Sequence, residues 1–199
     1  MILIFSGESG AGKDYITKNF INKYPEDFEL HISTTTRPIR EGEKEGVNYH
    51  YISKEEFLKK IEKNEFIEYR SYDTLVNGVA DTWYYGTEAF QKEQNKNYVV
   101  IKDLEGAKVL KDYCKSLDIP VVHIYISVSD KLREERAKAR GSFNQTEWDR
   151  RILADQKDFA ADKVKDCDYV LTNEGNIDET LQKLEDILNI EKEYEIEPV

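Results

Sequence analysis

Cysteine is scarce in this chain, and histidine is nearly as rare. The 199 residues include two cysteines, Cys114 and Cys167, which lie far apart and lack the spacing of metal ligands. We therefore expect reduced thiols in a cytoplasmic protein rather than a disulfide or a zinc site. The three histidines, His31, His50 and His123, are scattered along the chain, so we expect packing or surface roles for them.

Net positive charge and long apolar runs are also missing. The chain has 40 Asp and Glu against 29 Lys and Arg, which gives a net charge of −11. This balance excludes a chain-wide surface for nucleic acid or for an anionic membrane, so local groups of arginine need a local reason. No apolar run approaches the length of a membrane span, and no secretory signal is expected at the N-terminus. The length suits one α/β domain with a sizeable core, without repeats or low-complexity linkers.

A glycine-rich stretch near the start of the chain is the strongest motif present. It follows an apolar run at residues 2–5 and precedes helical apolar spacing over residues 14–24, the context that a phosphate-binding loop requires. Glycines let successive N–H groups point at an anion, and the lysine adds a full charge. A turn that merely ends the strand is the weaker alternative, because strand, helix and lysine are all in place. The stretch fits the pattern G-x-x-x-x-G-K with Gly7, Glu8, Ser9, Gly10, Ala11, Gly12 and Lys13.

Strand-like apolar runs alternate with amphipathic helical segments along nearly the whole chain. This alternation predicts an α/β fold with a parallel sheet and helices on both faces, and with ligands at the carboxyl end of the first strand. Strands are expected at residues 2–5, 28–33, 98–101, 121–126 and 169–172. Helices are expected at residues 14–24, 89–94, 104–117, 130–140, from 146 onward and after Asn176.

Residues 34–87 interrupt this alternation with short mixed elements. We expect them to form an inserted subdomain that faces the phosphate loop, while residues 1–33 and 88–190 form the core. Within the insertion, residues 71–83 are expected to be an irregular excursion around the turn dipeptide Asn77-Gly78. Residues 191–199 are expected to be a frayed acidic tail.

Five sequence blocks in a fixed order complete the pattern. They are G-E-S-G-A-G-K, S-T-T-T-R-P-I-R with G-V-N-Y downstream, E-F-I-E-Y, Y-Y-G-T and D-L-E-G-A. With these blocks, residues 1–188 resemble the guanylate kinases. The resemblance implies a P-loop kinase fold with an inserted nucleotide-monophosphate-binding subdomain and a helical lid at about residues 130–151. It also implies the transfer of a phosphate from ATP, bound with Mg²⁺, to GMP or dGMP.

The resemblance assigns the acceptor nucleotide to residues of the insertion and its borders. An acceptor phosphate needs cationic and hydroxyl donors, and the planar fork of arginine suits it. Guanine presents donors at N1 and its exocyclic amine and an acceptor at O6, so a site that reads it needs carboxylates and hydroxyls. Arg37, Arg40 and Tyr49 match the family's residues that bind the acceptor phosphate. Its acidic readers, the carboxylates that recognise guanine, match Glu68 and Asp103, and its hydroxyl readers match Ser33 and Thr87. Tyr85 matches an aromatic residue that also reaches the phosphate.

Three arginines match the lid of the family: Arg136, Arg140 and Arg151. Phosphoryl transfer needs positioning and cancellation of charge, which cations on a closing lid provide while they exclude water. A salt-bridged surface helix is the alternative, given the glutamates nearby. We expect Arg133 and Arg150 to be surface residues of that kind.

Two departures from the family concern the metal. Asp14 follows Lys13, where a Ser or Thr usually supplies a hydroxyl to magnesium, and Ile101 stands where the family often has an acid. We hypothesise that Asp14 takes over the anchoring of Mg²⁺, directly or through a water. The alternative is that Asp14 only caps its helix, where negative charge is favourable in any case.

Other functions stay open at this stage. The base-reading set argues against a kinase of another small phosphate ester, such as a ribose bisphosphate. Guanylate-kinase-like scaffold domains, which only bind, lose the phosphate loop that this chain keeps. A nucleoside-monophosphate kinase broadened towards other deoxynucleotides stays open, because sugar preference leaves no clear mark here. Expected partners are ATP and GMP or dGMP, without nucleic acid or membrane, for a monomer or homodimer.

Overall fold

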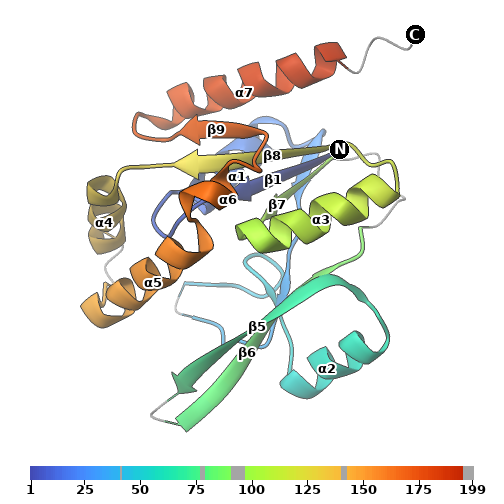
Figure 1. The fold of residues 1–199 in the computed structure, drawn as a ribbon, viewed down its shortest axis with the longest axis vertical. Helices are drawn as coiled ribbons and strands as arrows, with labels where there is room; N and C mark the ends of the chain where they lie inside the picture. The colour runs from blue at the N-terminus through green and yellow to red at the C-terminus, as the bar shows by residue number, and fades with distance from the viewer. Residues whose placement is uncertain (41, 77–78, 91–96, 140–142, 195–199) are drawn as a thin grey trace.

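The buried strands expected from the sequence form one parallel sheet at the centre of the molecule (Figure 1). The structure is a computed structural model, and it describes residues 1–40, 42–76, 79–90, 97–139 and 143–194. The strand order β2-β7-β1-β8-β9 has only parallel pairs, so the predicted α/β class with a parallel sheet is confirmed. The strands are β1 (Ile2–Ser6), β2 (Phe28–Leu30), β7 (Asn97–Ile101), β8 (Val121–Ser127) and β9 (Tyr169–Thr172).

Alternate residues of β1 build two separate cores. Leu3 and Phe5 pack with α1 (Lys13–Lys23) and α7 (Ile177–Tyr194) on one face. Ile2 and Ile4 pack with α3 (Leu104–Ser116) on the other. Figure 1 shows α7 and α3 on opposite sides of the sheet. Because side chains of a strand alternate between faces, β1 is buried on both, and the loop that follows it starts from a rigid base.

A second sheet, of order β4-β3-β6-β5, lies within the predicted insertion. Its strands are β3 (Thr34–Thr35), β4 (His50–Tyr51), β5 (Phe66–Val76) and β6 (Val79–Glu88), and α2 (Lys54–Glu62) packs beside them. The fully buried Phe57 of α2 stacks on Phe66, with ring centroids 4.4 Å apart, and so attaches the helix to the hairpin. Ser53 and Glu56 form a capping box at the start of α2.

Three expectations about local structure are wrong. Residues 71–83 are not irregular, because β5 and β6 continue as a regular antiparallel hairpin with pairs such as Tyr72↔Trp83 and Asp73↔Thr82. The aromatic and β-branched residues there favour strand, and an Asn-Gly dipeptide between two such runs predicts a hairpin. Residues 77–78 themselves lie outside the described residues.

The other two errors concern helix positions. Ala89 and Phe90 are not helical, and the rest of the helix expected at 89–94 lies outside the described residues. Helix α7 runs to Tyr194, four residues into the expected tail. The remaining division into core, subdomain, lid and tail stays a prediction.

Between β8 and β9 the described residues form three helices, which are α4 (Asp130–Ala139), α5 (Gln145–Asp158) and α6 (Ala161–Val164). Of these, α4 and the first half of α5 fall in the range predicted for the lid. Helices α4 and α5 lie beside the carboxyl end of β8 (Figure 1). Within the described ranges, no helix is both long and apolar enough to cross a membrane.

Candidate active site

The glycine-rich loop joins β1 to α1 as the motif requires. Gly10 and Gly12 have φ values of 82° and 88°, which L side chains rarely adopt. A Cβ on Gly10 would also lie 2.8 Å from the backbone oxygen of Arg133, so α4 packs too closely for any other residue. The Lys13 ammonium crosses the loop and donates to the carbonyls of Gly7 at 2.5 Å and Glu8 at 3.1 Å.

Arg133 supports this loop from behind, which corrects its assignment as a surface residue. It is only 2% exposed and pairs with Asp130 at 2.8 Å, Asp155 at 3.3 Å and Glu8 at 3.4 Å. It also donates to the Ser9 carbonyl, while the Asp155 carboxylate accepts from the Ser9 N–H at 2.7 Å. Sequence reasoning missed this role because the nearby glutamates suggested a solvated helix, whereas the acids that pair with Arg133 come from three separate segments.

Asn173 and Arg136 hold the other side of the loop. Asn173 Nδ2 donates to the Ala11 carbonyl at 2.9 Å, and Arg136 donates to the carbonyls of Asn173 at 2.9 Å and Ala11 at 3.4 Å. Burial lowers the pKa of the Arg136 guanidinium from its usual value. Arg136 therefore lies at the phosphate loop, and its action on ATP stays a prediction. Arg140 lies outside the described residues.

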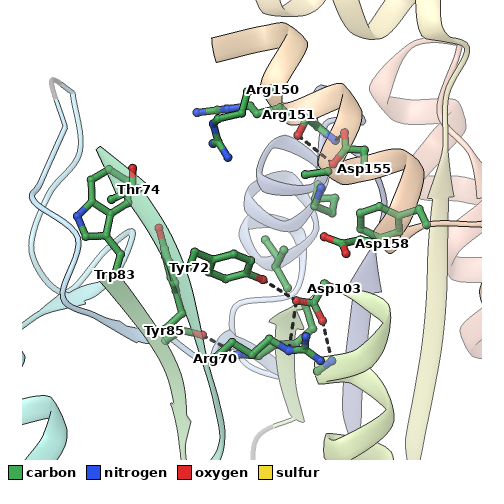
Figure 2. A pocket seen from close by; sticks show the side chains of 18 of the residues that line it. Arg70, Tyr72, Thr74, Trp83, Tyr85, Asp103, Arg150, Arg151, Asp155 and Asp158 are labelled. Atoms are coloured by element: carbon green, nitrogen blue, oxygen red, sulfur yellow. Dashed lines mark hydrogen bonds and ion pairs between the residues drawn. The ribbon is translucent and has the colours of Figure 1, made fainter. Parts of the chain in front are cut away.

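A cavity of about 880 Å³ lies in front of the loop and connects it with the second sheet (Figure 2). Hairpin residues such as Tyr72 and Trp83 form one wall, and α5 with Arg150 and Arg151 forms another. Arg150, expected to be surface charge, is exposed but lines this cavity. The cavity brings together these predicted site residues: Gly7, Ser9, Lys13, Ser33, Arg40, Tyr49, Glu68, Tyr85, Asp103 and Arg151.

The residues predicted to bind the acceptor phosphate are held in place by a carboxylate that sequence reasoning missed. Glu43 accepts two bonds of 2.9 Å from Arg37, one of 2.8 Å from the Arg40 N–H and one of 2.8 Å from the Tyr51 hydroxyl. Burial opposes the charge on Glu43, but these bonds outweigh it and lower the pKa of Glu43 to about 2. Arg37, 4% exposed, also lies beneath the Tyr49 ring at 5.4 Å. Glu43 thus fixes the orientation of Arg37.

Positively charged side chains lie close together where the residues predicted to bind the acceptor phosphate meet α5. Partial burial and the charges of Arg37 and Arg151 lower the pKa of Arg40. Like charges brought together in this way favour an anion between them. Tyr49 lies close by, and burial, with the neighbouring Tyr85 and Asp14, raises the pKa of its hydroxyl to about 12, so it is a neutral donor.

Each predicted acidic reader is paired with a cation that sequence reasoning did not assign. Glu68 accepts from the Lys102 ammonium at 2.7 Å and from the Thr87 hydroxyl at 2.5 Å. Asp103 lies 3.5 Å from Arg70 and accepts from the Tyr72 hydroxyl at 3.1 Å, as Figure 2 shows. Each of these partners lies far along the sequence from the carboxylate that it contacts, so local spacing does not predict the pairing.

Asp103 also caps α3. Its Oδ1 accepts from the Gly106 N–H at 2.6 Å, the bond expected from an N-cap carboxylate. A structural role therefore accounts for part of what the sequence suggested as base recognition. Asp14, in contrast, is exposed in the first turn of α1 and is not the N-cap residue of that helix, which is Gly12.

The donors for a metal are few. The part of the chain that the structure describes contains no group of three His, Cys, Asp or Glu side chains placed to hold a metal ion. Mg²⁺ that is bound with a nucleotide keeps several waters and needs only one or two carboxylates, so the exposed Asp14 beside the loop fits that limited requirement.

The phosphate loop follows the central strand of a parallel sheet. It faces a cavity lined by cations from the insertion and from the segment after β8. This combination defines a P-loop kinase. A family model described as guanylate kinase matches residues 1–191. This chain belongs to the guanylate kinase family.

Individual relatives agree with this assignment. The chain is 33% identical to the guanylate kinase of Rickettsia felis, with 97% of this chain and 95% of the relative covered. It is 35% identical to that of Helicobacter hepaticus, over 87% of this chain and 82% of the relative. The crystal structure of guanylate kinase from Anaplasma phagocytophilum matches with a TM-score of 0.60 and 27% identity, covering 96% of this chain and 85% of that chain.

The support of the loop by Arg133 can be tested through stability. Replacement Arg133→Met leaves Glu8 and Asp155 without their cation, and breaking a buried ion pair costs about 3–5 kcal/mol. Lys138→Met on the same helix removes an exposed pair with Glu134 and is expected to cost about 1 kcal/mol or less. Urea unfolding measures both, and equal losses would show that Arg133 is ordinary surface charge.

Proposed function

We propose that this chain transfers the terminal phosphate of ATP to GMP or dGMP, giving ADP and GDP or dGDP. ATP-dependent phosphorylation of GMP is the activity of the family to which the chain belongs. The observation that carries the proposal is the single cavity that joins the phosphate loop to the acceptor-side residues Arg40, Tyr49 and Glu68. The intact loop with Lys13 supports an enzyme over a scaffold domain that only binds.

The acceptor phosphate binds on the basic side of the cavity. Arg40 and Tyr49 line it, and Arg37 lies behind them with three of its five N–H groups used by Glu43 and the Pro38 carbonyl. Its remaining donors and those of Arg40 hold the phosphate in line with ATP. No general base is needed, because the attacking oxygen is already an anionic phosphate.

The transferring phosphate is held from the opposite side. Lys13 exchanges its bonds to the loop carbonyls for bonds to the outer phosphates, and the loop N–H groups bind them as well. Arg136 and Arg151, with Arg140, place positive charge around the group as it moves and exclude water. Asp14 would hold the Mg²⁺ that is bound with ATP, and the metal would neutralise charge on the phosphates.

Cytoplasm is the compartment we propose, because both cysteines are free thiols. Burial raises the pKa of the thiols of Cys114 and Cys167 to about 11, so neither is a reactive thiolate near neutral pH.

A coupled assay with ATP and a panel of GMP, dGMP, AMP, CMP, UMP and dTMP tests the function. Turnover of GMP or dGMP well above the others is expected, since the cavity offers carboxylates and hydroxyls in the pattern that guanine needs. If none of them is turned over, the interpretation as an enzyme fails and a binding module is the remaining alternative. A preference for a pyrimidine would reassign the acceptor.

Arg151→Ala is expected to lower kcat by a much larger factor than it lowers the affinity for GMP without ATP. Arginines that stabilise the transferring phosphate contribute about 10³-fold or more to kcat. Steady-state kinetics and GMP titration separate the two effects. Lys157→Ala, at the end of the same helix and outside the cavity lining, serves as the control. A normal kcat for Arg151→Ala would make it surface charge only.

Asp14→Asn distinguishes a metal ligand from a charge that only favours the start of α1. If Asp14 holds Mg²⁺, the amide should raise the Mg²⁺ concentration for half-maximal rate and leave the thermal midpoint nearly unchanged. If Asp14 serves only the helix, the Mg²⁺ requirement should not move, and the thermal midpoint should fall slightly because favourable negative charge at the helix N-terminus is lost. Titration of the rate with Mg²⁺ and thermal unfolding without nucleotide measure both, and an unchanged Mg²⁺ requirement would rule out the metal role.

A further inference from the structure

Lys102 occupies a position in the cavity that the resemblance to guanylate kinases does not assign. It directly follows β7 and precedes Asp103, the N-cap of α3, and its side chain is 9% exposed. Its ammonium donates to Glu68 Oε1 at 2.7 Å and to Ser33 Oγ at 3.2 Å. Glu68 is 7% exposed, and all three residues line the cavity. A buried, paired lysine therefore stands among the residues expected to read the base.

The hydrogen bonds of this group decide which donors remain for a ligand. The fully buried Thr87 gives its hydroxyl hydrogen to Glu68 Oε1, so it has none left for a base carbonyl. Lys102 has three N–H donors, of which two are used within the described residues. Within the described residues, Glu68 Oε1 accepts the bonds from both Thr87 and Lys102, which leaves Oε2 for further donors. The open positions are thus an ammonium donor next to a carboxylate acceptor.

A donor beside an acceptor matches one kind of purine edge. Guanine presents the O6 acceptor next to the N1–H donor, with its 2-amino donor beyond. Adenine presents the reverse order, with a 6-amino donor next to the N1 acceptor. Adenine at this place would set an amine against the ammonium and a lone pair against the carboxylate, and such mispaired buried groups are strongly disfavoured.

We propose that Lys102 is a specificity-determining residue that donates to O6 of the acceptor base, while Glu68 accepts from N1–H and the 2-amino group. The proposal rests on the proposed function and assigns to Lys102 the carbonyl that sequence reasoning gave to the hydroxyls of Ser33 and Thr87. Ser33, whose oxygen accepts from Lys102, keeps its own hydrogen as a second donor.

The surroundings of Lys102 support a charged donor. Its partner Glu68 balances its charge at 2.7 Å, so an ion pair rather than a lone cation is buried. His31 lies near, and its burial together with the charge of Lys102 lowers the pKa of that imidazole to about 4, so it stays neutral and does not compete for Glu68. Arg70, the other cation of this region, is already engaged with Asp103 and Glu105.

Kinetics with GMP, IMP and AMP separate a reader of O6 from a residue that only positions Glu68. IMP keeps O6 and N1–H but lacks the 2-amino group. Lys102→Met should lower kcat/KM for GMP and IMP by the same factor, about 10- to 100-fold for a lost charged hydrogen bond. The variant should also have a smaller ratio of kcat/KM for GMP to kcat/KM for AMP than the wild type. Glu68→Gln should instead lower GMP more than IMP, because only GMP loses the bond from its amine.

A measurement with the wild-type chain keeps the proposal falsifiable if Lys102→Met folds poorly, and a second one in Lys102→Met completes the comparison. With the wild-type chain, 6-thio-GMP replaces O6 by a weak acceptor, so its kcat/KM should fall about tenfold or more below that of GMP. In Lys102→Met, the ratio of kcat/KM for GMP to that for 6-thio-GMP should be smaller than in the wild type, as in a double-mutant cycle, although the Ser33 hydroxyl retains part of it. Lys108→Met, an exposed lysine of α3, is the matched control and should behave as wild type.

Three outcomes would overturn the proposal. One is an unchanged kcat/KM for GMP in Lys102→Met, and another is equal use of GMP and 6-thio-GMP by the wild type. The third is a loss in Lys102→Met that falls on GMP more than on IMP, as in Glu68→Gln, since that pattern makes Lys102 a positioning residue for Glu68. If the wild type turns over GMP and any of these occurs, the inference alone fails. If it neither binds nor turns over GMP, the proposed function fails with it.

Discussion

The backbone of the phosphate loop is the constraint on which the rest of the site depends. To aim its N–H groups at an anion, the loop takes left-handed conformations at Gly10 and Gly12 and turns its carbonyls outward. Those carbonyls and the Ser9 N–H need partners, which Arg133, Asp155 and Asn173 supply from α4, α5 and the end of β9. The helices after β8 are therefore tied to the loop before any nucleotide binds. A buried arginine at the centre of this contact transmits the position of α4 and α5 to the loop.

Charge balance is the second organising principle. An enzyme that binds two phosphorylated nucleotides needs many cations, yet this chain carries a net charge of −11. The structure reconciles the two by giving cations of the site a carboxylate partner: Arg37 with Glu43, Lys102 with Glu68, and Arg70 with Asp103. Arg133 is held in the same way by acids from three segments. Such pairs hold the cations in fixed orientations without leaving an isolated charge buried, and they keep the remaining donors directed at a ligand.

Sequence patterns predicted the elements whose signal is local. Apolar runs located every strand of the parallel sheet, and the glycine motif located the loop, because burial on both faces and positive φ each restrict residue type at consecutive positions. The hairpin at residues 66–88 was misread where its strands continue past Tyr69, although β-branched and aromatic residues around Asn-Gly carried the signal. The end of α7 was also misplaced, since an acidic segment without apolar periodicity gives little indication of where a helix stops.

The sequence by itself determined the class of fold, the phosphate loop and the family. Each of these follows from residues adjacent or regularly spaced along the chain. Only the tertiary structure decided how the charged residues pair. It buried Arg133 behind the loop, set Glu43 on Arg37 and placed Lys102 on Glu68, although Glu68 and Lys102 are 34 positions apart. The physical reason is that a buried charge is stabilised by whichever opposite charge the packing of strands and helices brings near it, and that choice is not written in local spacing.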